Sequence, residues 1–177
     1  MSRRLAQGLD ADVDRTRRAP VEAVVALGAN LGDRAATLTS AIDALRRLPL
    51  VDDVRVSIAV ESVAVKADGP DASAPTYLNA VALVTTRLAP SVLLGYLHAI
   101  ESRHGRERRE RWGDRTLDLD LIAYGDVRSD GPRLVLPHPR AAVRDFVLVP
   151  WLDVDPDAVL PGTGRVDAAL ARLRGEQ

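Results

Sequence analysis

Two aspartates stand two positions apart in a run of leucines. Asp118 and Asp120 alternate with Leu117, Leu119 and Leu121. In a β-strand, residues i and i+2 project from the same face, so both carboxylates point one way while the leucines point into the core. Two like charges side by side on a strand repel each other, and a bound cation is the natural reason to keep them there. The spacing therefore predicts a strand with a divalent-metal site on one face.

An arginine-rich segment runs directly into this strand. Residues 102–115 contain one tryptophan, Trp112, and six arginines: Arg103, Arg106, Arg108, Arg109, Arg111 and Arg115. Metal ions and guanidinium groups share the negative charge of phosphates in phosphoryl transfer. Taken alone, an Asp-x-Asp strand or an arginine-rich segment is more often an ordinary solvent-exposed surface. Here Glu107, Glu110 and Asp114 also offset part of the arginine charge. Their direct junction favours phosphoryl-type transfer, with the solvated face as the open alternative.

The composition is that of one ordinary globular domain. The 177 residues are 46% hydrophobic and carry a net charge of −1, so no overall field favours nucleic acid or a membrane. The absence of cysteine rules out a disulfide framework and is compatible with a reducing cytoplasm. Residues 1–20 are polar and lack the apolar segment of a signal peptide. We expect a disordered extension or linker at 1–20 and a single domain at 21–177, acting as a cytoplasmic monomer.

Hydrophobic periodicity and turn residues divide this domain into strands and helices. Strands are expected over residues 21–27, 54–65, 78–87, 117–124 and 133–136. Helices are expected between Asp33, a predicted N-cap, and Pro49, over residues 90–101 and over residues 166–173, with a short helix or turn over residues 141–151. Residues 66–76 are expected to form a loop. This order predicts the α+β class, as a ferredoxin-like βαββαβ sandwich with extra short strands and a C-terminal helix.

Four motifs together resemble one family. Residues 111–121, Arg-Trp-Gly-Asp-Arg-Thr-Leu-Asp-Leu-Asp-Leu, are similar to the signature of the hydroxymethyldihydropterin pyrophosphokinases of folate biosynthesis. Residues 26–34, 77–80 and 136–140 resemble three further segments of that family, in its order. The resemblance covers roughly residues 21–160. It implies transfer of a pyrophosphoryl group from ATP to the hydroxymethyl oxygen of the pterin, with release of AMP.

The resemblance also assigns phosphate-binding roles. Asp118 and Asp120 would be the protein ligands of two Mg²⁺ ions, while Arg106 and Arg115 would contact the transferring phosphates. The positions matched around ATP are Glu101, Arg108, Arg115, Arg133, His138 and Arg144. Glu101 could equally orient an arginine, and a histidine in a Pro-His-Pro segment is more often structural. The only partners implied are ATP and the pterin, with no nucleic acid and no membrane.

The pterin is expected to lie between two aromatic rings. Tyr77 and Phe146 match the positions that sandwich it, and Asn79 matches the amide that reads its edge, where one side chain offers both donor and acceptor. Trp112 would pack over either ligand or anchor its own segment. Ser62 opens the stretch that stands where family members carry a Thr-Pro-Pro-Leu-Gly segment.

Two departures and two alternative classes accompany this interpretation. Asp114 replaces the usual proline of the signature, and the arginine segment is one residue shorter than in the best-known members.

A metal-dependent nucleotidyltransferase could use the same carboxylate pair, but it would usually add a Gly-Ser helix start, and none is joined to the pair here. A ferredoxin-like RNA-binding module would need several aromatics on central strands. Residues 78–87 contain none, and residues 117–124 carry the carboxylates.

Overall fold

A computed structural model describes residues 19–66, 69–71, 75–104 and 116–176. Arg106, Arg108, Trp112 and Arg115 lie outside these ranges, as does most of the expected extension at residues 1–20. Within the described ranges, no helix combines the length and apolar character needed to cross a bilayer.

The fold is a mixed α/β architecture built on one antiparallel sheet. Its strands are β1 (Val21–Ala29), β2 (Val51–Val56), β3 (Val60–Ser62), β6 (Tyr77–Thr86) and β7 (Asp118–Tyr124). The order across the sheet is β2-β6-β1-β7, and β3 pairs with the other end of β6. The central strands β1 and β6 are therefore paired on both sides, which agrees with their nearly continuous apolar sequences.

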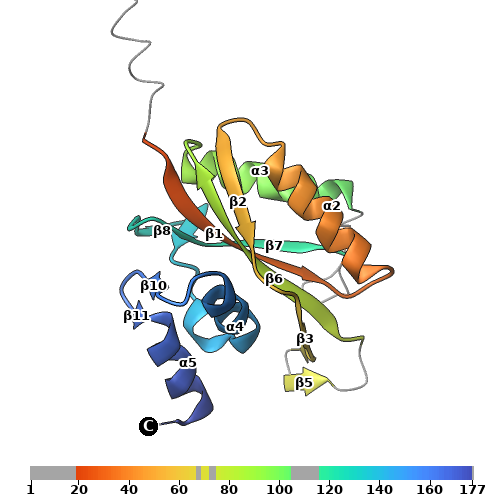
Figure 1. Cartoon of the computed structure of the whole chain (residues 1–177), viewed down its shortest axis with the longest axis vertical. Coiled ribbons are helices and arrows are strands. Elements are labelled where there is room, and N and C mark those ends of the chain that lie inside the picture. Colours follow the sequence, from red (N-terminus) through yellow and green to blue (C-terminus); the bar gives the residue numbers. More distant parts are fainter. Residues whose placement is uncertain (1–18, 67–68, 72–74, 105–115, 177) are drawn as a thin grey trace, which may run out of the picture.

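Two helices cover one face of this sheet (Figure 1). They are α2 (Arg34–Arg46), whose N-cap Asp33 accepts a hydrogen bond from the backbone of Ala36, and α3 (Pro90–Arg103), which begins at a proline. Both helices begin where the sequence predicts. Apolar residues from these helices and the near side of the strands form the larger core, which includes Val25, Leu27, Leu38, Leu45, Leu93, Leu97, Leu119 and Leu121.

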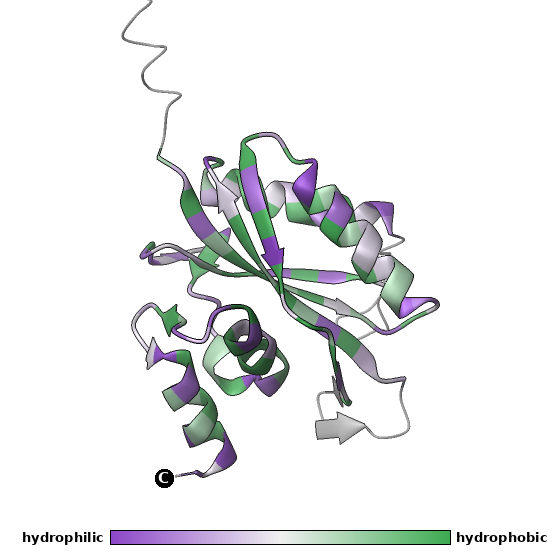
Figure 2. Cartoon of the chain, viewed as in Figure 1, coloured by the Kyte–Doolittle hydropathy of each residue, from purple (hydrophilic) through white to green (hydrophobic). Residues whose placement is uncertain are grey.

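The opposite face carries a second core. It is covered by the 3₁₀ turn Ala141–Val143, α4 (Asp145–Val154) and α5 (Val166–Arg174), and Figure 1 shows both helices on the far side from α2 and α3. Figure 2 shows hydrophobic residues along the central strands, and hydrophilic residues on α2 and α5. The buried residues of this second core include Val81, Leu83, Ile122, Val147, Leu148, Trp151, Leu160 and Val166.

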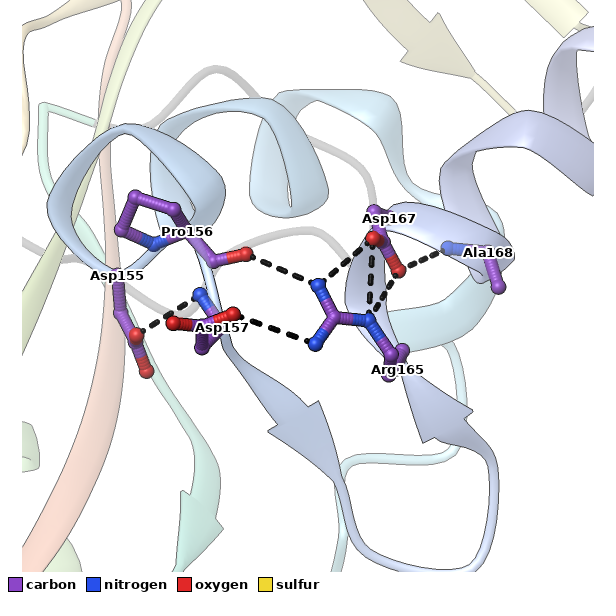
Figure 3. Close-up of polar contacts among 6 residues, drawn as sticks. All are labelled: Asp155, Pro156, Asp157, Arg165, Asp167 and Ala168. Atoms are coloured by element: carbon purple, nitrogen blue, oxygen red, sulfur yellow. Dashed lines mark hydrogen bonds and ion pairs between the residues drawn. The ribbon is translucent and has the colours of Figure 1, made fainter.

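A polar cluster fixes α5 to the loop after α4. The hairpin of β10 (Val159–Leu160) and β11 (Gly164–Arg165) leads into α5. The guanidinium of Arg165 donates to both carboxylate oxygens of Asp167, to Asp157 over 3.3 Å and to the carbonyl of Pro156 (Figure 3). The hydrogen bonds from Arg165 hold the pKa of the Asp167 carboxyl below the usual value of an aspartate. One side chain thus joins the hairpin, the helix start and the preceding loop.

The edge strand next to β6 differs from the sequence prediction. One strand was expected over residues 54–65, but the chain forms β2, β3 and β4 (Ala64–Lys66) with breaks between them. At residues 57–59, Ser57 accepts from the backbone N–H of Val81, and Asp153 on α4 accepts from the N–H of Ile58 over 2.7 Å. These side chains take up backbone N–H groups at the break between β2 and β3 and join it to α4.

The remaining strands are short. β5 (Gly69–Asp71) pairs with β4 inside residues 66–76, so the expectation of a plain loop there is wrong. β8 (Ser129–Gly131) pairs with β9 (Leu134–Leu136), which is the short strand expected near residue 133. Residues 141–151 contain a 3₁₀ turn followed by the first part of α4.

Candidate active site

The register of three strands aligns an amide, a glycine and a carboxylate. Gly28 of β1 lies opposite Asn79 of β6 on one side and opposite Asp118 of β7 on the other. Directly paired residues project from the same face of a sheet, so Asn79 and Asp118 point the same way with a glycine between them. This face is the one on which α4 packs, since Val81 of β6 also belongs to the core beneath α4.

Asp120 extends this row along the same strand. It lies opposite Ala26 and, like Asp118, is half-buried, whereas the flanking leucines are 1% (Leu117), 2% (Leu119) and 4% (Leu121) exposed. The alternation along β7 is therefore as predicted, with the carboxylates on one face and the leucines in the core.

Gly28 leaves little room for a side chain at the centre of the row. A Cβ atom at this position would lie 3.2 Å from Oδ1 of Asn79 and 3.6 Å from Cδ1 of Tyr77. A glycine inside a strand often marks close approach of another group to the backbone. Sequence reasoning assigned no role to Gly28, although its place inside an apolar strand was the available signal.

A basic pair surrounds Asp120. Nη1 of Arg144 donates to Oδ2 of Asp120 over 3.0 Å, and Nε2 of His138 lies 4.0 Å from the same oxygen. Burial lowers the pKa of His138 below its ordinary value of 6.5, while Asp120 opposes this shift and Arg144 adds to it. His138 is therefore neutral at pH 7, and Arg144 carries the positive charge beside the carboxylate.

Asn79 and Tyr77 occupy the other end of the row, whereas Phe146 adjoins Arg144. Asn79 is buried, and its Nδ2 donates to Oγ of Ser62 over 2.8 Å across the β3–β6 pair. Phe146, in the first turn of α4, lies with its ring centroid 5.6 Å from the guanidinium carbon of Arg144. Tyr77 stands opposite Ser62. Ser62, Tyr77 and Asn79 thus lie together on two paired strands, and Phe146 lies beside Arg144.

This arrangement can be compared with known proteins. The sequence profile of the family described as 7,8-dihydro-6-hydroxymethylpterin-pyrophosphokinase (HPPK) matches residues 24–156. The chain belongs to this family.

Named HPPK relatives match along most of their length. The 2-amino-4-hydroxy-6-hydroxymethyldihydropteridine pyrophosphokinase of Pseudomonas aeruginosa is 42% identical over 147 residues, which cover 83% of this chain and 88% of the relative. The enzyme of that name from Synechocystis sp. is 43% identical, with 81% of this chain and 71% of the relative covered. For Mycobacterium leprae the identity is 39%, with 85% and 82% covered.

The fold also matches solved structures. A crystal structure of a single-substitution variant of Plasmodium falciparum HPPK-DHPS with STZ-DHP superposes with a TM-score of 0.66 at 12% identity. The match covers 88% of this chain and 46% of that one, so this chain spans less than half the length of the larger protein. At such low identity the likeness concerns the fold alone.

Two residues matched to ATP in the HPPK family lie apart from the Asp120 cluster. Glu101 on α3 is buried, and its Oε1 accepts from the backbone N–H of Leu119 over 2.9 Å. It therefore holds the carboxylate strand from the helix side. Arg133 is exposed at the turn between β8 and β9. The predicted Arg106, Arg108, Trp112 and Arg115 belong to the part of the chain that is not described.

The carboxylate pair is suited to a hard divalent cation. Asp118 and Asp120 offer oxygen ligands on one face, and among the described residues no group of three or more His, Cys, Asp or Glu side chains could hold a metal ion. Mg²⁺ accepts one or two carboxylates and completes its shell with water and phosphate oxygens. The two carboxylates of this HPPK chain therefore fit a cation whose remaining ligands are water and the phosphate oxygens of a nucleotide.

Proposed function

We propose that this chain transfers the terminal pyrophosphoryl group of ATP to the hydroxymethyl oxygen of 6-hydroxymethyl-7,8-dihydropterin. A bond forms between that oxygen and the β-phosphorus, the bond from this phosphorus to the α–β bridging oxygen breaks, and AMP leaves with the bridging oxygen. The hydroxyl proton is released to solvent. The observation that supports the proposal is the row Asn79–Gly28–Asp118. An amide and a carboxylate lie on the strands either side of a glycine, and these are the groups proposed to read the heterocycle and to bind the metal.

The amide end is proposed to hold the pterin. With Nδ2 of Asn79 engaged by Ser62, its Oδ1 faces the space over Gly28 and can accept from a ring N–H or amino group. Tyr77 and Phe146 can supply aromatic faces on either side of the flat heterocycle. Ser62 then acts by fixing which way the amide points.

The carboxylate end is proposed to hold the phosphates. Asp118 and Asp120 would bind Mg²⁺, with two ions expected by resemblance. When bound, the metal offsets the charge of the phosphates and orients them for in-line attack. Arg144 and His138 adjoin Asp120 and would contact the nucleotide, together with the more distant Arg133.

The undescribed residues complete this assignment by resemblance. Arg106 and Arg115 are proposed to stabilise charge on the transferring group, with Arg108 on ATP and Trp112 over a bound ligand. Glu101 would contribute to the nucleotide site by holding β7 in place.

We further infer a ferredoxin-like sandwich for the sheet with α2 and α3, because its strand order has β1 and β6 central and both helices on one face. Residues 21–177 are proposed to act as one unit. A monomer and a cytoplasmic location are likewise proposed, by resemblance to the family.

The test is product analysis with matched carboxylate variants. The protein is incubated with ATP, magnesium and hydroxymethyldihydropterin, and AMP, ADP and pyrophosphate are quantified. We expect pterin-dependent AMP release that falls at least about 100-fold in Asp118→Asn and Asp120→Asn, because an amide is a poor substitute for an anionic ligand. Asp130→Asn, on an exposed hairpin strand, is the control. Release of ADP or pyrophosphate instead of AMP would contradict the proposal.

A further inference from the structure

One side chain links three segments behind the pterin end of the site. Arg34 is the first residue of α2, and its Nη1 donates to the backbone carbonyl of Thr76 over 2.9 Å and to the Thr76 hydroxyl over 2.7 Å. Its Nη2 donates to Oε1 of Glu61 over 2.8 Å. The guanidinium therefore joins the start of α2, strand β3 and the residue before β6.

The partners of Arg34 adjoin the candidate pterin contacts in sequence. Glu61 precedes Ser62 on β3, and Thr76 precedes Tyr77 at the start of β6. Ser62 and Tyr77 are paired directly across the two strands. Arg34 thus fixes the backbone one residue before each member of this pair.

The contact reaches the site from the opposite face of the sheet. Glu61 pairs with Leu78, which packs against the core under α2 and α3, whereas Val60 pairs with Asn79. Because successive residues of a strand face opposite sides, Glu61 points toward α2 while its neighbour Ser62 points toward the site. Arg34 can therefore order the site without touching anything bound in it.

We propose that Arg34 is a positioning residue for the pterin end of the site. This inference rests on the proposed function. Three charge-assisted hydrogen bonds from one planar fork fix the separation and the angle between β3 and the start of β6. That separation sets the Ser62–Asn79 hydrogen bond and the place of the Tyr77 ring, and hence the shape of the surface that meets the heterocycle.

The experiment compares the two substrates in the same variants. Arg34→Gln removes the charge and the fork, and Arg34→Lys keeps the charge alone. We expect the KM for hydroxymethyldihydropterin to rise about tenfold in Arg34→Gln, with the KM for ATP within about twofold of wild type. Arg34→Lys is expected to recover only part of the loss, since an ammonium cannot reproduce the bidentate geometry. Calorimetric titration of the pterin in the presence of a non-hydrolysable ATP analogue gives the same comparison for binding.

Two further variants separate positioning from a general effect. Arg55→Gln removes another ion pair of the same sheet, 2.9 Å to Glu22, and is expected to leave both KM values unchanged. Glu61→Gln removes one partner from an exposed position where folding is not threatened, and is expected to raise the pterin KM about threefold. This variant decides the question if Arg34→Gln fails to fold.

The outcomes that overturn the inference are distinct from those that overturn the function. An active wild type whose pterin KM is unchanged in Arg34→Gln and Glu61→Gln would show that Arg34 does not position the site. Parallel loss of ATP binding, pterin binding and thermal stability would make it a general structural residue. A wild-type chain that neither binds the pterin nor releases AMP would instead overturn the proposed function, and this inference with it.

Discussion

Nη1 of Arg144, the N-cap residue of α4, donates to Oδ2 of Asp120 over 3.0 Å, and this contact connects the start of the helix to the carboxylate strand. The same guanidinium lies 5.6 Å from the centroid of Phe146. Arg144 thus connects the residue proposed for metal binding to a ring proposed for the pterin. A positive charge at this point also reduces the repulsion between Asp120 and Asp118 when no cation is bound.

Replacing Arg144 should affect the nucleotide and the bare metal in opposite directions. In Arg144→Gln we expect the KM for ATP to rise roughly tenfold, because a charged donor near the phosphates is lost. Binding of Mn²⁺ without nucleotide should become tighter, because Asp120 no longer has a cationic partner. Steady-state kinetics and calorimetry measure the two effects. Arg172→Gln, on the exposed side of α5, is the control, and a change of both quantities in the same direction would contradict the interpretation.

A methyl group at residue 28 should block the pterin and spare the fold. The added Cβ of Gly28→Ala would lie 3.2 Å from Oδ1 of Asn79, in the space proposed for the heterocycle. We expect the pterin KM to rise about tenfold or more while the melting temperature stays within a few degrees of wild type. Gly95→Ala is the matched control, since nothing lies within 4 Å of its added Cβ, and it should raise stability by about 0.5–1 kcal/mol through helix propensity. Normal pterin affinity in Gly28→Ala would place the ligand elsewhere.

The half-buried imidazole of His138 should make stability depend on pH. Burial lowers its pKa, so between the native pKa and the unfolded value near 6.5 the unfolded chain binds more protons than the native one. The contribution of this group to stability is therefore lost as the pH falls below that value. Urea unfolding of wild type and His138→Gln between about pH 5 and about pH 8 should show the wild type losing relative stability toward acid pH. Parallel curves for the two proteins would contradict this.

The segment between β2 and β3 should be stabilised by one side chain of α4. Asp153 accepts from the N–H of Ile58 over 2.7 Å, so Asp153→Ala should lower the free energy of unfolding by about 1 kcal/mol. Asp153→Asn keeps an acceptor oxygen and should lose less than half of that. Denaturant unfolding measures both. An equal loss of unfolding free energy in the two variants would mean that the charge of Asp153, and not its hydrogen bond, stabilises the segment between β2 and β3.

Local patterns predicted most of the sheet and the faces of its strands. The alternation of residues 117–121 predicted which side chains of β7 are buried, because a half-buried strand leaves that signal in the sequence. The N-cap at Asp33 and the start of α3 at Pro90 were likewise local features. The family resemblance supplied the assignment of Tyr77 and Asn79, which periodicity alone could not give.

The contacts that complete the site lie far apart in the sequence and could not be predicted. Arg144 donates to Asp120, which lies 24 residues away in the sequence, and Arg34 donates to Thr76, which lies 42 residues away. The break in the edge strand depends on Asp153, 95 positions from Ile58, so the apolar run at residues 54–65 gave no sign of it. Such pairings follow from the sheet order, which a one-dimensional pattern does not contain.

The carboxylate strand is an edge strand in the described part of the sheet. β7 pairs with β1 on its inner side, and Glu101 accepts the backbone N–H of Leu119. Residues inserted or deleted before an edge strand need not displace a neighbouring strand, so the register that holds Asp118 and Asp120 can survive them. The family resemblance predicts an arginine segment before β7 that is one residue shorter than in the best-known members. A change of length before β7 is therefore compatible with unchanged positions of the two carboxylates proposed to bind metal.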